Sequence, residues 1–147
     1  MGIGIDIERS VSLEPLKPKL ATTVKQSVKM CAVDLLRVSQ ERAPYDTGTL
    51  EKSGHLTISS SNYLVRGLVG FSAVNRGFNY ALWTDKKQYT PSSKSLAKGG
   101  GRTTMYAGTL PVGTGYLSDT AKKCKLGYEL YIAKKIGSSI ASSGFHS

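Results

Sequence analysis

Hydrophobic positions change their spacing along the chain in a way that predicts both strands and helices. Ile3, Ile5 and Ile7 alternate with polar or small residues, which is typical of a short strand with one buried face. From about Pro18 apolar residues recur every three or four positions, and this spacing predicts a long amphipathic helix. Its apolar stripe consists of Leu20, Val24, Val28, Cys31, Leu35 and Val38. We expect this helix to end just before Pro44, because a residue that precedes proline is displaced from the α region.

The stretch APYDTGTLEKSG, from Ala43 to Gly54, predicts a corner between two helices. Asp46 or Thr47 can cap a short second helix that runs through Leu50, because either side-chain oxygen can accept a free backbone N–H. Gly54 can end that helix. This interpretation gives the stretch a structural role.

Three further segments predict extended structure. HLTISSS and YLVRGLVGFS are typical of two strands with a turn near residues 60–62, and FNYALWTD predicts a third extended or edge segment. Together with the N-terminal strand, these segments would form a small antiparallel sheet.

The hydrophobic pattern is absent from Lys86 to about Gly115. This segment is rich in glycine and holds five basic residues and no acidic residue. Long loops without secondary structure are uncommon in compact domains and are usually functional or disordered. We therefore predict a long mobile loop over residues 86–115.

Helical spacing returns after this loop and continues for six turns. Ser118 is a suitable N-cap, and Asp119 suits the positive end of the helix dipole. The apolar positions of this second long helix are Leu117, Ala121, Cys124, Tyr128, Ile132, Ile136 and Ile140.

These elements predict one α+β domain that spans residues 1–147. Two long helices would pack on a small antiparallel sheet of three to four strands, with the long flexible basic loop before the last helix. The length suits a single domain, and no internal repeat is present.

The charge of the chain indicates an anionic partner or a charged assembly surface. Twenty basic and ten acidic residues give a formal net charge of +10. Nucleic acid, an acidic protein face and an anionic membrane would all suit this excess. We expect no secretory signal at the start of the chain and no membrane span, because the first residues lack a basic start with an apolar core and no apolar run is long enough to span a bilayer. We expect a soluble protein made in a reducing cytosol, without membrane contact.

Residues that could carry chemistry are few. His55 begins a predicted strand and His146 lies near the end, so both are expected to be ordinary surface or capping histidines. Cys31 and Cys124 fall on the apolar stripes of the two long helices and are expected to be small buried hydrophobes. Their thiols could be neighbours if the helices pack side by side.

An enzyme would need a pocket with convergent polar groups. Asp46 and Glu51 could meet near the predicted corner, and a cleft around them or around His55 would favour a small hydrolase. Asp46 as a helix cap is favoured over Asp46 as a catalytic group. We therefore expect no enzyme, and no catalytic, metal or cofactor site.

Basic and aromatic residues alternate in the predicted loop, and three interpretations remain open. Single-stranded nucleic acid is bound by aromatic side chains placed among cations. A solvated loop kept soluble by its lysines is the second interpretation, and a segment that folds against a partner subunit is the third. The candidate contact residues are Lys86, Lys87, Tyr89, Lys94, Lys98 and Arg102.

The corner that follows the first long helix contains the run Ala43, Pro44, Asp46, Thr47, Gly48, Leu50 and Ser53. It resembles a motif of the tail-completion or neck proteins of long-tailed phages, which are often called minor capsid or head–tail joining proteins. In that family a long helix ends in Ala-Pro-x-Asp-Thr-Gly-x-Leu, followed closely by a serine.

Two weaker matches follow, so the resemblance extends from the first long helix to the last. Tyr80, Ala81, Leu82 and Trp83 fit a Tyr-Ala sequence with a short apolar segment, and Asp85 takes the place of the family's acid. The glycine that usually follows is missing, because Lys86 stands there. LPVGTGYLSDTAKK is similar to the family's proline-containing approach to its final helix.

The resemblance implies a virion structural protein of the head–tail connection, without a catalytic residue or a cofactor. It implies a homo-oligomeric ring, for which we expect sixfold symmetry, and contacts with phage connector, terminator and tail-tube proteins. The protein would be found in the neck or tail of the virion, and in the host cytoplasm during assembly. Its basic residues would face packaged DNA or acidic faces of those partners. The alternative is a basic nucleic-acid-binding protein that uses the Lys/Arg-rich loop.

Overall fold

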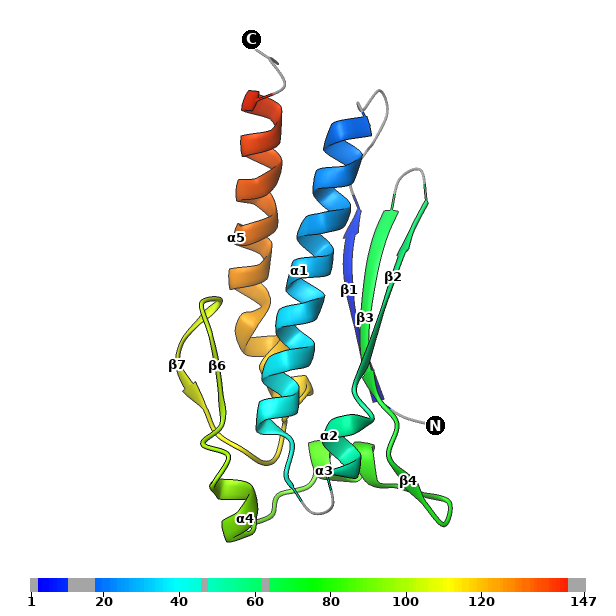
Figure 1. Cartoon of the computed structure of the whole chain (residues 1–147), viewed down its shortest axis with the longest axis vertical. Helices are drawn as coiled ribbons and strands as arrows, with labels where there is room; N and C mark the ends of the chain where they lie inside the picture. The colour runs from blue at the N-terminus through cyan, green and yellow to red at the C-terminus, as the bar shows by residue number, and fades with distance from the viewer. Residues whose placement is uncertain (1–2, 11–17, 46–47, 62–63, 143–147) are drawn as a thin grey trace.

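The structure, a computed structural model, describes residues 3–10, 18–45, 48–61 and 64–142. It combines two long helices with a small antiparallel sheet, so the predicted mixture of helix and sheet is confirmed. The helix α1 (Pro18–Arg42) lies between the sheet on one side and the helix α5 (Ser118–Ser142) on the other (Figure 1).

The sheet contains the three strands β1 (Ile3–Ser10), β2 (His55–Ser60) and β3 (Leu64–Phe71), in the order β1-β3-β2. Both neighbours run antiparallel to β3, and the register places Ile5 opposite Val69 and Ile58 opposite Gly67. One face packs on α1. A side chain at Gly67 would crowd Val28 and Ala32, because the helix approaches this strand closely. The predicted strands at Ile3–Ile7 and after Gly54 are therefore confirmed.

The apolar stripe of α1 is buried along its whole length, as its spacing predicts. Its six members are all less than 10% exposed: Leu20, Val24, Val28, Cys31, Leu35 and Val38. The helix ends at Arg42, directly before the buried Ala43 and Pro44. Proline therefore ends the helix where the sequence predicted.

The second long helix, α5, packs along α1 and not on the sheet, which corrects the expected layer order. Cys124, Tyr128 and Ile132 of its stripe are buried in the core shared with α1. α1 can serve both neighbours because it is apolar over a wide arc: Val28 and Ala32 face the sheet, and Cys31 approaches α5. The segment just before α5 does contact the sheet. The ring centroids of Tyr116 in this segment and Phe71 at the end of β3 lie 5.1 Å apart.

A short helix, α2 (Thr49–Lys52), follows the corner as predicted, but its cap differs. Gly48 occupies the N-cap position with φ 81°, in the left-handed region that glycine adopts easily. The prediction that Asp46 or Thr47 is the N-cap residue is therefore wrong, and both residues lie outside the described part of the chain.

The segment FNYALWTD is mostly helical, so its predicted extended structure is wrong. Only Phe78 and Asn79 are extended, as β5, which pairs with β4 (Val74–Asn75) in a hairpin. The helix α3 (Tyr80–Lys86) follows at once. Asn79 starts it, because its Oδ1 accepts a hydrogen bond from the backbone N–H of Leu82 at 3.0 Å.

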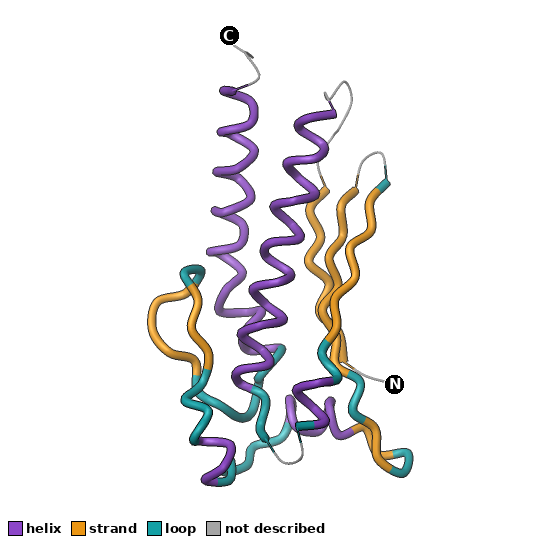
Figure 2. The backbone as a smooth tube through the Cα atoms, viewed as in Figure 1, coloured by secondary structure: helices purple, strands orange, loops and turns teal. Residues whose placement is uncertain are grey.

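The segment 86–115 is not the structureless loop that was predicted. It contains the helix α4 (Ser93–Leu96) and a hairpin of β6 (Gly101–Thr103) and β7 (Tyr106–Leu110) (Figure 2). The hairpin lies beside the two long helices, and a side chain at Gly101 would clash with Val38 of α1. These elements are too short for periodicity to indicate. β6 contacts α1, β7 contacts α5, and Ser95 of α4 is hydrogen-bonded to the backbone of Tyr45.

Candidate functional site

The corner from Ala43 to Ser53 begins in the core at the end of α1. Ala43 and Leu50 are buried, and so is Pro44. Ser53 donates a hydrogen bond from its Oγ to the carbonyl of Leu50 at 2.7 Å and accepts one from the backbone N–H of Ser72 at 3.1 Å. Ser53 thereby connects α2 to the end of β3. The described members of the motif therefore have structural roles.

Arg42, directly before this corner, connects the end of α1 to the start of α5. Its side chain is 2% exposed. The guanidinium donates to the carbonyl of Pro111 at 2.8 Å, to Oδ2 of Asp119 at 2.9 Å and to Oγ1 of Thr120 at 2.9 Å. Three acceptors around one buried cation make this a fixed structural contact. Sequence reasoning did not identify Arg42, because its partners lie 69 to 78 positions away.

Asp119 is the anionic partner in this contact. Burial would raise the pKa of its carboxyl, but hydrogen bonds from Lys123 and Arg42 outweigh that effect and hold the pKa below its ordinary value of 3.8. The carboxylate is therefore the stable form. Its position in the first turn of α5 also suits the positive end of the helix dipole.

Asp85 caps α5 from a distance in the sequence. Its Oδ1 accepts hydrogen bonds from the backbone N–H groups of Leu117 and Ser118, at 2.9 and 3.0 Å, and its carbonyl accepts one from Gly115 at 2.8 Å. The helix begins at Ser118 itself, so the prediction of Ser118 as the N-cap is wrong. Asp85 is 1% exposed, and it serves the helix start as an N-cap side chain would.

Lys98, one of the candidate contact residues, is directed into the protein. Its ammonium donates to the carbonyls of Gln40 and Ala43, both at 2.7 Å, and to Oε2 of Glu51 at 3.0 Å. A cation that binds the last carbonyls of a helix stabilises its negative end. Lys98 therefore completes the end of α1, and Glu51 is paired with it.

The other candidate contact residues lie on separate elements. Lys86 and Lys87 are exposed at the end of α3, and Lys94 on α4 places its ammonium 4.4 Å from the ring centroid of Tyr45. Arg102 on β6 donates to Oγ1 of Thr109 at 2.9 Å. Tyr89 donates its hydroxyl to the carbonyl of Thr84. Each of these contacts joins a candidate residue to a different partner, and none joins two of the candidates to each other.

β4 and α3 lie at the end of the molecule opposite the end at which α5 finishes (Figure 1), and β5 lies between them in the chain. We call the exposed apolar residues of these three elements the end patch: Val74, Phe78, Leu82 and Trp83, which are 47%, 51%, 42% and 39% exposed. The Trp83 ring lies 6.4 Å from Phe78 and stacks on Tyr89 at 5.6 Å. Clustered exposed apolar surface often marks a protein–protein contact.

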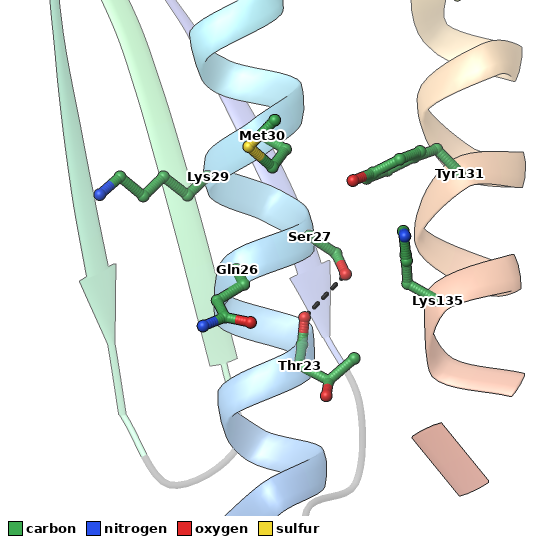
Figure 3. Close-up of a pocket in the computed structure, with 7 residues that line it drawn as sticks. All are labelled: Thr23, Gln26, Ser27, Lys29, Met30, Tyr131 and Lys135. Carbon is green, nitrogen blue, oxygen red and sulfur yellow. Dashed lines mark hydrogen bonds between the residues drawn. The ribbon is translucent and has the colours of Figure 1, made fainter. Parts of the chain in front are cut away.

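A groove of about 390 Å³ lies between α1 and α5, away from the end patch. Figure 3 shows Tyr131 extending from α5 towards α1, with the Lys135 side chain directed towards Tyr131. The Lys135 ammonium lies 5.5 Å from the ring centroid of Tyr131, and Ser27 donates to the carbonyl of Thr23 at 2.7 Å. The remaining lining residues are Gln26, Lys29 and Met30. The described residues that line the groove include no carboxylate, imidazole or thiol.

Among the described residues, the two cysteines are buried and His55 is exposed. Cys31 and Cys124 are buried free thiols, and burial together with the nearby Asp34 carboxylate raises the pKa of Cys31 to about 12. The exposed His55 places its Nδ1 3.1 Å from the carbonyl of Ser53, and His146 lies outside the described residues.

Within the described ranges, no group of three or more His, Cys, Asp or Glu side chains could hold a metal ion. Among the helices of those same ranges, none is long and apolar enough to cross a membrane. Comparisons with protein-family models, with curated proteins and with solved structures gave no match.

Proposed function

We propose that the protein is a virion structural protein of the head–tail connection of a long-tailed phage, and that it assembles through protein–protein contacts as part of a ring. The end patch is the observation that carries this proposal. Its four apolar side chains expose a surface that a neighbouring subunit can cover. The resemblance of the corner from Ala43 to Ser53 supplies the type of assembly.

The interior supports an assembly role in a second way. Its charged side chains join helix ends: Arg42 links α1 to α5, Asp85 caps α5, and Lys98 completes α1. These contacts hold together the end of α1, the start of α5 and the helix α3, which carries part of the end patch. A rigid interface loses less conformational entropy when a partner binds.

In the proposed assembly, the end patch of one subunit packs on a different face of the next. Such heterologous contacts close into a ring when the rotation between subunits allows it, and sixfold symmetry would match the proposed position at the neck. The remaining surfaces of the ring would contact connector, terminator and tail-tube proteins. The positive charge would face packaged DNA or acidic faces of those partners.

The test uses a phage whose genome encodes this chain, with the corresponding gene deleted. Supplying the wild-type protein in trans should restore infectious particles. The variant Phe78→Ser with Leu82→Ser should fail to restore them, because it removes apolar contact area from the end patch. Circular dichroism should show the same folded protein, since both side chains are exposed in the single subunit.

Met30→Ser is the matched control, because Met30 is 53% exposed on α1 and lies far from the end patch. We expect it to restore the titre fully. Restoration by the double variant would contradict a role of the end patch in assembly. Full infectivity of the phage without any of this protein would contradict the proposed function itself.

A further inference from the structure

The helix α5 carries a second apolar stripe on the face turned away from α1. We call it the outer stripe: Leu126, Leu130, Ala133 and Gly137. Leu126 is 66% exposed and Leu130 is 61% exposed, the two highest values among the large exposed hydrophobic residues of the described chain. Ala133 and Gly137 are exposed as well. A Cβ atom added at Gly137 would meet no described atom within 4 Å.

The spacing of the outer stripe fits another helix. Its members follow one another after four, three and four residues, which is the spacing of the contact positions in a coiled coil. A strand would need apolar residues at every second position. The outer stripe extends over about three helical turns.

The sizes of the four side chains favour a copy of the same helix in antiparallel orientation. In the antiparallel register that aligns the midpoints of the two outer stripes, Leu126 of one copy lies opposite Gly137 of the other, and Leu130 lies opposite Ala133. Each large side chain then meets a small residue, so the layers interdigitate. A parallel pair would instead place Leu against Leu at one end and leave Gly against Gly at the other.

The charges of α5 favour the same orientation. Lys122 and Lys123 lie near its start, one on each side of the outer stripe, whereas its last turn contains no basic residue. Antiparallel pairing brings these lysines to the C-terminal end of the partner helix, where the helix dipole is negative. Parallel pairing would bring each lysine close to its own copy.

We propose that the outer stripe binds the outer stripe of a second copy of this chain, with the two α5 helices antiparallel. The contact is twofold, so it cannot build a ring by itself, and it does not rest on the proposed function. One helix pair of this length buries less surface than a standard stable interface. The contact should therefore be weak and depend on protein concentration.

Cysteine cross-linking tests this register. Leu126→Cys and Gly137→Cys are prepared as separate proteins, and the two are mixed under mild oxidation. The native Cys31 and Cys124 are fully buried and stay unreactive. Facing positions of the antiparallel pair should form a disulfide, which shifts the band from the 15.8 kDa of one copy to the mass of two.

Leu126→Cys alone should stay monomeric, because its two copies would lie on opposite sides of the twofold axis. Leu96→Cys, at an equally accessible position on α4, is the control for random collision with Gly137→Cys. Cross-linking of the mixture above this control supports the proposal. A mixture that does not exceed the control, or Leu126→Cys alone cross-linking as well as the mixture, overturns it.

A second measurement needs no disulfide. Analytical ultracentrifugation is carried out on proteins that carry Phe78→Ser and Leu82→Ser, so that association through the end patch is removed. In this background we expect a concentration-dependent increase in mass, and adding Leu126→Lys and Leu130→Lys should abolish it. Both side chains are solvent-exposed, so the fold should persist in circular dichroism. A mass increase that persists unchanged in this variant would contradict the outer stripe as the contact.

Discussion

At the scale of single residues, charged side chains at helix ends join the end of α1 to the start of α5 and to the corner that follows α1. Asp85 accepts the first free N–H groups of α5, and Lys98 donates to the last carbonyls of α1. Arg42 spans the two helices through Asp119. Asp85 and Asp119 lie at the positive start of α5, and Lys98 lies at the negative end of α1, so these three charges face dipole ends of the opposite sign.

Replacing Asp85 tests this capping role. Asp85→Ala removes the acceptor of two buried backbone N–H groups, and we expect it to lower the free energy of unfolding by about 1–3 kcal/mol. Asp85→Asn keeps an acceptor oxygen and should cost less. Urea unfolding measures both, with the exposed Glu129→Ala on α5 as the control. Equal stability of Asp85→Ala and wild type would show that Asp85 does not cap α5.

The carboxylate of Asp119 predicts a dependence of stability on pH. Its pKa is lower in the folded protein than the ordinary value of 3.8, so its contribution is fully present above that value and is lost as the pH falls through the folded pKa. Asp119→Asn should therefore be less stable than wild type at pH 7, and the difference should narrow below about pH 4. Urea unfolding at several pH values measures it. A difference that stays constant with pH would contradict the ion pair.

The sequence revealed these residues unevenly. In the sequence, Asp85 matches only the acidic residue of the phage neck-protein motif. Its capping role depends on Leu117 and Ser118, 32 and 33 positions later. Lys98 was grouped with solvent-exposed cations, because composition does not show that a lysine will reach the carbonyl of Gln40. Contacts between distant positions leave no periodic signal, so they had to come from the structure.

At the scale of elements, α5 contains two glycines with opposite surroundings. Gly127 packs against the backbone of Met105 in the β6–β7 hairpin, whereas Gly137 faces open space. The first glycine lets the hairpin approach the helix, and the second has no such role within one copy.

Alanine at these two positions should have effects of opposite sign. Gly127→Ala places a methyl group against backbone that cannot rotate away, and we expect a loss of about 1–3 kcal/mol. Gly137→Ala should raise stability by about 0.5–1 kcal/mol, because glycine disfavours a helix interior. Thermal unfolding at low concentration measures both changes. Two changes of the same sign would contradict the packing of the hairpin on α5.

Element length decided what the sequence could predict. The long helix that ends at Arg42 and the strands around Gly67 were indicated by spacing, because each contains several periods. The helix α3 was mistaken for a strand, since one capping residue, Asn79, outweighed a stretch of bulky side chains. The pairing of α5 with α1 was not indicated, because an apolar stripe does not say which neighbour will cover it.

At the scale of the whole molecule, the described residues include two groups of exposed apolar side chains on separate elements. The end patch carries aromatic side chains beside the corner, and the outer stripe lies along α5. The sequence suggested neither directly: Leu82 and Trp83 were assigned to a strand, and Leu126 and Leu130 lie off the core stripe. Their exposure and a net charge of +10 favour a protein that works by contact with other macromolecules.

Electron microscopy of lysates tests the proposed place in the virion most directly. The phage that encodes this chain is grown with and without the gene, and the particles are imaged. We predict filled heads and free tails that lie unjoined when the protein is missing, and joined particles when it is supplied in trans. Complete particles with heads joined to tails in its absence would contradict a role at the head–tail connection.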